Sequence, residues 1–166
     1  MDTIPSILLH MLEHESSQAR FVLASVKDVD MQFTPMDSLR TLDDLANHLA
    51  LSPLIDFYCY TKKFQEVEQV QEMEQQLKCD NIEDMLKAFD KGIGIIKEHI
   101  SALSNDQALE ENLKAVYEQG PDRNWAHYLP EITTHLAMHK MQLWMYLKLA
   151  GAPVSMWTYY GVPRNE

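Results

Sequence analysis

Four long segments of this chain repeat apolar side chains at the three- and four-residue spacing of an amphipathic α-helix. Alternating strand patterns are absent, and only five of the 166 residues are glycine. The segments cover residues 4–26, 41–63, 81–103 and 130–151. The pattern predicts an all-α fold, a four-helix bundle with alternating helix directions and a short C-terminal tail, formed by one domain over residues 1–166.

Residues at the expected helix ends agree with these segments. Thr41 can cap the second helix, with Asp44 reaching back as in a capping box. Pro53 should bend that helix because proline removes a backbone donor. Pro130 is typical of a first turn and Gly151 of a helix end. The stretch QEVEQVQEMEQQLKCD, which precedes the third helix, is predicted to be a solvated extension of the second helix or a helical connector.

The charge of the chain argues against some classes of partner. Acidic residues outnumber basic ones by 25 to 14, for a net charge of −11. Nucleic acids and anionic membranes favour clustered Lys and Arg, so we expect neither as a partner. No uncharged apolar run approaches the roughly 18 residues of a membrane span. The start MDTIPS lacks the basic segment of a signal peptide, so we expect a cytoplasmic protein.

The two cysteines, Cys59 and Cys79, fit no zinc-finger spacing. We expect free thiols, with a catalytic Cys59 as the alternative.

Two pairs of histidines have the i, i+4 spacing that places both rings on one helix face. His10 and His14, in HMLEH, point about 120° away from the apolar face of the first helix. His135 and His139, in HLAMH, lie within the apolar face of the last helix. Buried ring nitrogens need partners, and a divalent metal would satisfy both at once. Two separately hydrogen-bonded core histidines are the alternative.

A third metal ligand is available in His48, in LANHLAL. If helix directions alternate, the second and last helices are parallel, and His48 reaches the level of His135 and His139. His99 and His127 have no such coincidence in height. They are expected to be structural or solvent-facing, with His127 a further candidate for a proton relay.

At these positions the sequence resembles the DinB/YfiT-like family of metalloenzymes. The resemblance rests on the first histidine in TLDDLANHLA and on HLAMHKMQLWMYLKLAG, which is similar to the family pattern H-x-x-x-H-[RK]-x-Q-[LI] followed by an aliphatic helix and glycine. The closing YYG is similar to the aromatic tail of many members. Many members carry a further histidine where this chain has Met138.

The resemblance implies a four-helix bundle, often dimeric, in which His48, His135 and His139 hold one divalent cation, Zn or Ni, with Mn or Fe as alternatives. It also implies an enzyme that joins a low-molecular-weight thiol, such as bacillithiol or mycothiol, to an electrophilic small molecule in stress or detoxification. A metal-dependent hydrolase and a non-catalytic helical bundle that binds metal or another protein are the alternatives. An open coordination position would favour an enzyme.

Several residues are expected to support this centre. Gln142 and Tyr146 continue the row of His135 and His139 and could fix a ligand ring by a hydrogen bond. Glu15 and Gln18 interrupt the apolar face of the first helix, and Glu15 is a candidate general base. A glutamate bonded to a tyrosine or lysine at the bundle edge is the alternative for Glu15.

The loops near residues 27–40 and 104–129 are expected to open at the metal's end of the bundle. They carry candidates for contact with a substrate or cofactor: Arg40, Arg123, Trp125 and Tyr128. The last helix is also apolar outside its core row, which predicts a homodimer interface or cover by the C-terminal tail. The residues of that outer face are Met138, Met141, Trp144 and Met145.

Overall fold

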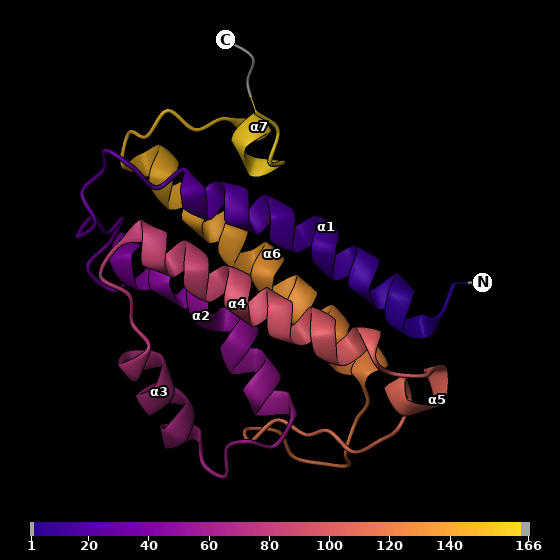
Figure 1. The fold of residues 1–166 in the computed structure, drawn as a ribbon. Coiled ribbons are helices and arrows are strands. Elements are labelled where there is room, and N and C mark those ends of the chain that lie inside the picture. The colour runs from indigo at the N-terminus through magenta and orange to yellow at the C-terminus, as the bar shows by residue number, and fades with distance from the viewer. Residues whose placement is uncertain (1, 164–166) are drawn as a thin grey trace.

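The structure is a computed structural model that describes residues 2–163. Four long helices and three short ones form it, and the only β pairing among those residues is an isolated bridge between Leu113 and Arg123. The long helices pack side by side around one apolar core (Figure 1). In chain order the elements are α1 Ile4–Ala24, α2 Leu42–Tyr60, α3 Val67–Gln76, α4 Ile82–Ser101, α5 Asn105–Ala108, α6 Trp125–Leu149 and α7 Met156–Tyr159.

Side-chain caps explain where the long helices begin. Thr41 accepts a hydrogen bond from the backbone N–H of Asp44 (3.1 Å), as expected for the start of α2. The start of α6 differs from the prediction near Pro130. Asn124 caps α6 by accepting from the N–H of His127 (3.1 Å), and Pro130 lies inside the helix. Pro130 therefore removes one hydrogen bond within α6 instead of marking its first turn.

The four long helices do not alternate in direction, in contrast to the prediction. The segment that contains α3 returns the chain to the end where α2 began, and Asn47 of α2 bonds the backbone of Cys79 there (3.1 Å). Consequently α2 and α4 are parallel, whereas α6 runs antiparallel to α2 (Figure 1). The rings of Tyr60, at the end of α2, and Tyr128, at the start of α6, stack at 4.1 Å.

These directions also separate the two long loops that were expected at one end. The loop at 25–41 joins the end of α1 to the start of α2, and the segment at 102–124 joins the end of α4 to the start of α6. The two therefore lie at opposite ends of the bundle (Figure 1).

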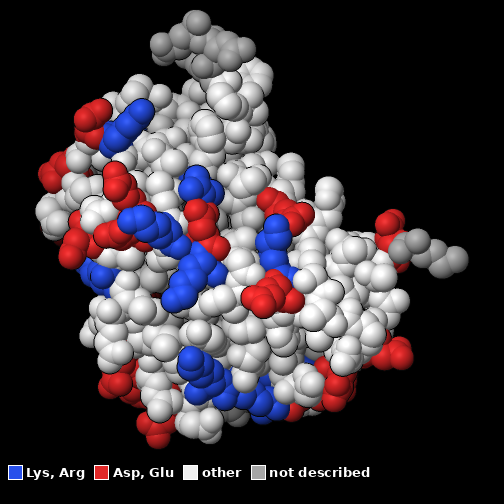
Figure 2. Space-filling model, in the orientation of Figure 1, with Lys and Arg blue, Asp and Glu red and all other residues white. Residues whose placement is uncertain are grey.

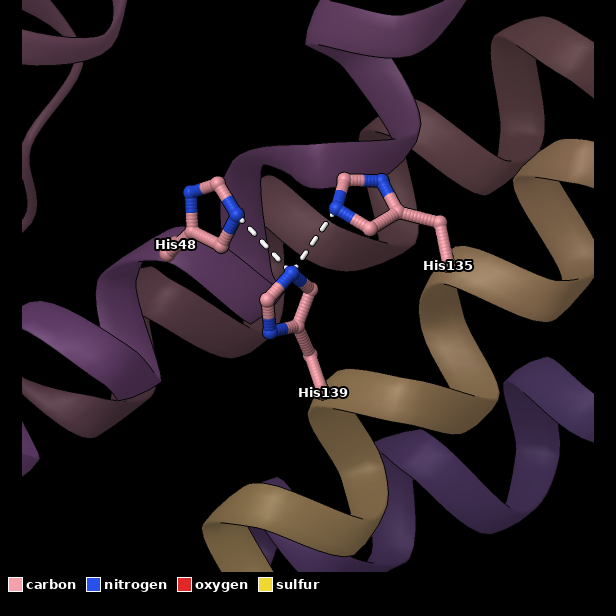
Figure 3. Close-up of side chains that lie close together, drawn as sticks. All are labelled: His48, His135 and His139. Carbon is pink, nitrogen blue, oxygen red and sulfur yellow. Dashed lines mark hydrogen bonds between the residues drawn. The ribbon is translucent and has the colours of Figure 1, made fainter.

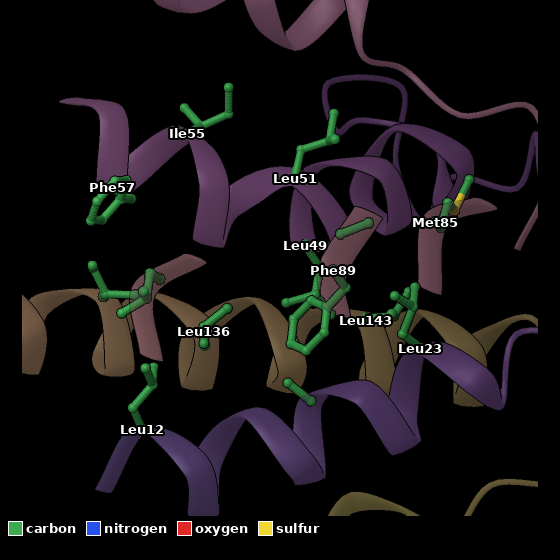
Figure 4. Packing of buried hydrophobic residues seen from close by; sticks show 14 of the residues in the cluster. Leu12, Leu23, Leu49, Leu51, Ile55, Phe57, Met85, Phe89, Leu136 and Leu143 are labelled. Carbon is green, nitrogen blue, oxygen red and sulfur yellow. The ribbon is translucent and has the colours of Figure 1, made fainter. Parts of the chain in front are cut away.

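All four long helices contribute to the core. Leucine side chains from α1, α2 and α6 interdigitate with Met85 and Phe89 of α4 (Figure 4). On the face formed by α1 and α4, acidic and basic side chains lie next to one another (Figure 2). There Arg20 pairs with Asp90 at 2.7 Å across the two helices. Among the described residues no helix is long and apolar enough to cross a membrane.

The outer face of α6 is covered in part by the chain's own C-terminal segment. Trp144 is 7% exposed. Its indole N–H donates to the carbonyl of Ser155 (2.9 Å), and its ring meets Tyr159 edge-on at 5.7 Å. Trp144 is therefore not free to form the predicted homodimer interface. Met141 and Met145 remain exposed, and contact with a second copy there stays a prediction.

The helices α2 and α4 lie in close contact at Gly92. A Cβ at this position would lie 2.8 Å from the backbone N of Leu54 and 2.9 Å from Cβ of Pro53. Pro53 lies inside α2, whose ribbon changes direction near its middle (Figure 1). The absence of a side chain at Gly92 thus allows α4 to pack on this part of α2.

We expect the Gly92→Ala variant to lower the free energy of unfolding by about 1–3 kcal/mol, since the new methyl group must displace backbone. Gly94→Ala on the same helix is the control. A Cβ there meets nothing within 4 Å, so the gain in helix propensity should raise the free energy of unfolding by roughly 0.5–1 kcal/mol. Urea titrations of both variants measure the effects. Equal stabilisation by both would contradict the close approach.

Candidate metal centre

The structure brings His48 of α2 together with His135 and His139 of α6 (Figure 3). The Nε2 atom of His139 lies 3.0 Å from Nε2 of His48 and 2.8 Å from Nε2 of His135. One nitrogen from each ring lies within 4.8 Å of the other two. These separations are close to the roughly 3.3 Å between ligands of a tetrahedral ion with bonds of about 2.0 Å.

The other nitrogen of each ring faces an oxygen acceptor. His48 Nδ1 lies 2.5 Å from Oε1 of Glu74, on α3, and His135 Nδ1 lies 2.7 Å from Oδ2 of Asp56, on α2. His139 Nδ1 lies 2.7 Å from Oε1 of Gln142. Because a carboxylate or carbonyl oxygen can only accept, each Nδ1 carries the proton, and the neutral ring has a lone pair on Nε2.

When all three rings are neutral, their Nε2 lone pairs therefore point at one another with no proton to share. A hydrogen bond between two of the rings would require an imidazolium. A divalent cation would satisfy all three nitrogens at once, so the residues fit the metal that the sequence resemblance implies. Asp56 and Glu74 supply two negative charges next to the rings, which matches the charge of such a cation.

The charge state of the histidines in the metal-free protein follows from their surroundings. Burial, together with the nearby His48, lowers the pKa of His139 to about 4. Burial also lowers the pKa of His135, but the hydrogen bond and charge of Asp56 outweigh it, so the net shift is upward. The hydrogen bond from His48 lowers the pKa of Glu74, which keeps this carboxyl group ionised.

Two cavities adjoin the three histidines. One, of about 380 Å³, is lined by His48, Arg40, Glu74 and Lys78, among others. The second, of about 440 Å³, is lined by His135 together with Asp56, Tyr60, Tyr117, Pro130, Glu131, Thr134 and Met138. The side chains of His48 and His135 are 22% and 27% exposed, whereas His139 is buried. A ligand could therefore reach this centre from either side.

Other residues predicted to serve the site lie elsewhere. Tyr146 packs edge-on against Phe33 and, among residues 2–163, forms no hydrogen bond with the three histidines. Arg123 is exposed, its backbone pairs with Leu113, and it lines neither cavity. Burial and the charge of Asp56 raise the pKa of Cys59 to about 12, so this cysteine is a neutral thiol and a poor nucleophile.

Glu15 and Gln18 of α1 contact Lys140. The Lys140 ammonium lies 2.7 Å from Oε1 of Glu15 and donates to Oε1 of Gln18 (2.7 Å), and it lies over the ring of Tyr159. Lys140 directly follows His139 in the chain, so Gln18 lies at the predicted height, level with the candidate metal ligands. It contacts a different face of α6, however, from the face that carries His135 and His139. The structure thus has Glu15 in the lysine pairing considered as the alternative, and neither residue lines the two cavities.

Sequence reasoning missed Asp56 and Glu74. Asp56 is an isolated acid in the apolar stretch LSPLIDFYCY, about two turns after His48 on the same helix, and a lone acid among apolar residues was a usable signal. Glu74 belongs to a segment rich in Glu and Gln, where nothing distinguishes it from its neighbours.

Comparison with known proteins identifies the fold. No family model and no curated protein matches the chain. A crystal structure of a candidate member of the DinB family, from Exiguobacterium sibiricum 255-15, superposes with a TM-score of 0.72. The match covers 93% of this chain and 97% of the other, at 17% sequence identity.

The chain has a DinB-like fold. At this identity the match concerns the course of the backbone alone. In this DinB-like bundle, the features that fit a metal are its own three histidines and their acceptors.

Acidification should release a bound divalent cation by protonating His135. Below the raised pKa of His135 the cation must displace a proton, so the apparent Kd should rise about tenfold per pH unit as the pH falls. Asp56→Asn removes the charge that raises this pKa. Weakening should then begin at a lower pH in the variant, as measured by Zn²⁺ titration between about pH 5 and 8. An unchanged onset would show that Asp56 does not control the protonation of His135.

The ion pair of Glu15 should contribute to stability and leave metal binding unaffected. Glu15→Gln leaves the ammonium of Lys140 buried without its anion, so the free energy of unfolding should fall by about 3 kcal/mol. Glu13, on the same helix as Glu15, forms an exposed ion pair with Lys97 of α4, and the Glu13→Gln variant should cost less than about 1 kcal/mol. Both variants should retain wild-type zinc content. Loss of zinc from a stable Glu15→Gln protein would assign Glu15 to the metal centre.

Proposed function

We propose that this chain is a divalent-metal-dependent enzyme that transfers a small thiol to an electrophilic compound. The observation that carries the proposal is the convergence of three imidazole lone pairs between two cavities. Three protein ligands leave room for a further one, which is typical of catalytic sites and not of closed structural sites.

His48, His135 and His139 would hold the cation, and Glu74, Asp56 and Gln142 would fix the orientation of their rings. When bound, a divalent cation supplies a Lewis acid that favours the thiolate form of a thiol near neutral pH. The chain's own residues bind and orient the two reactants beside it.

Two reactants suit the two cavities. Arg40 lines the cavity beside His48 and forms no ion pair among the described residues, so its guanidinium is free to bind a carboxylate of a small anionic thiol. The cavity beside His135 is lined in part by Tyr117, Pro130 and Met138, which offer apolar surface to the electrophile. A hydrolase binds one organic substrate and water, so two cavities favour a transferase over a hydrolase.

The proposal is tested first by metal content. Protein purified without a histidine tag and passed through gel filtration should retain at least one Zn²⁺ or Ni²⁺ per chain. The His135→Ala variant should retain one equivalent less than the wild type, whereas His10→Ala, which removes an exposed histidine of α1, should match the wild type. Equal metal in His135→Ala and wild type would contradict the three-histidine site.

Activity is then measured with the metal-loaded protein, a chromogenic aryl halide and two thiols. We expect conjugation that requires the metal and His135. Arg40→Ala should raise KM for mercaptosuccinate about tenfold, because a charge-assisted hydrogen bond is lost, and should leave KM for uncharged 2-mercaptoethanol unchanged. Lys91→Ala, at an exposed position of α4, is the control for lost positive charge.

The same assays separate the alternatives. Metal-dependent ester hydrolysis without conjugation of any thiol would identify a hydrolase. Metal binding without either activity would identify a non-catalytic bundle.

A further inference from the structure

A second group of metal-ligating side chains lies at the start of α6. Glu118, in the segment between α5 and α6, meets His127 and Glu131 of α6, and one ligand atom from each lies within 4.8 Å of the other two. His127 Nε2 is 3.0 Å from Oε1 of Glu131. The group shares no residue with the three-histidine centre.

Buried tyrosines orient both carboxylates of this group. The hydroxyl of Tyr128, a fully buried residue, donates to Oε2 of Glu118 (2.6 Å), and the hydroxyl of Tyr60 donates to Oε2 of Glu131 (3.5 Å). The two tyrosine rings stack on each other. Burial raises the pKa of both phenols, so both remain donors at neutral pH. Each carboxylate is thus held through its Oε2 atom by a tyrosine hydroxyl, and Oε1 of Glu131 faces His127.

No lysine or arginine neutralises these carboxylates. Among residues 2–163, neither Glu118 nor Glu131 forms an ion pair with a Lys or Arg, and the buried Asp56 lines the same cavity as Glu131. Two oriented carboxylates and one imidazole are a ligand set that suits Zn²⁺ or Mn²⁺.

We propose that Glu118, His127 and Glu131 form a second divalent-cation site, separate from the three-histidine centre. Glu118 comes from the loop and the other two ligands from α6, so a cation here cross-links the loop to the helix. Tyr117, the neighbour of Glu118, lines the cavity beside His135. Occupation of the second site therefore fixes one wall of that cavity.

The test uses the His135→Ala variant, in which the three-histidine centre is disabled, and Zn²⁺ alone as the probe. Calorimetric titration should give about one equivalent. Adding His127→Ala should abolish this binding, and adding Glu131→Gln, which keeps an acceptor for Tyr60, should weaken it at least tenfold. Adding His10→Ala should change nothing. Circular dichroism checks that each variant is folded.

Hydrogen exchange tests the cross-link. Saturating Zn²⁺ should slow amide exchange over residues 113–123 about tenfold in His135→Ala, and have no such effect once His127→Ala is added. Zinc binding that is equal with and without His127→Ala would overturn the second site. Binding that is lost with His127→Ala but leaves exchange unchanged would overturn the cross-link. Two equivalents in His135→Ala would support the second site and contradict the first.

Discussion

The antiparallel contact between α2 and α6 is the interaction on which the rest of the structure depends. It places a carboxylate, Asp56, in a position that is 7% exposed, where an unpaired charge would be costly. His135 of α6 supplies a partner for this carboxylate, through a 2.7 Å hydrogen bond from its Nδ1 atom. The same bond directs the lone pair of His135 towards His48 and His139. Packing of the bundle and orientation of the candidate metal ligands are therefore one arrangement of side chains.

The three histidines are held to different degrees, and the differences suit a site that exchanges ligands. His139 is buried and takes its Nδ1 partner, Gln142, from its own helix, so its position follows from α6 alone. His48 depends on Glu74 of α3, a short helix with no buried residue. The crossover that contains α3 thus has two roles: it makes α2 and α4 parallel, and it supplies an acceptor for one ligand. A movement of α3 would alter the ring of His48 before either ring on α6.

Periodicity and spacing were enough to predict the all-α bundle and to single out the three histidines that the structure brings together. The directions of the helices were not predictable in this way, because a helical connector and an extension of α2 have the same sequence pattern over residues 64–79. His48 also reaches the level of His139 when the two helices are antiparallel, so their heights predicted residues that the structure brings together, although the predicted topology was wrong. Glu74 could not be distinguished from other glutamates of α3, since its role depends on a contact between distant segments.

Contacts with distant segments also determine the surroundings of the polar and aromatic residues of α6, which could not be predicted from the sequence. Successive residues on a helix are separated by about 100°, so His139 and Lys140 must face different neighbours. His139 faces α2 and the metal centre, Lys140 faces Glu15 of α1, and Trp144 lies beneath the C-terminal segment. Because α6 is covered on three sides, its sequence is apolar on several faces, and this pattern suggested a dimer interface. The chain covers Trp144 itself, and the buried ion pair of Lys140 holds α6 against α1 independently of whatever binds to its histidines.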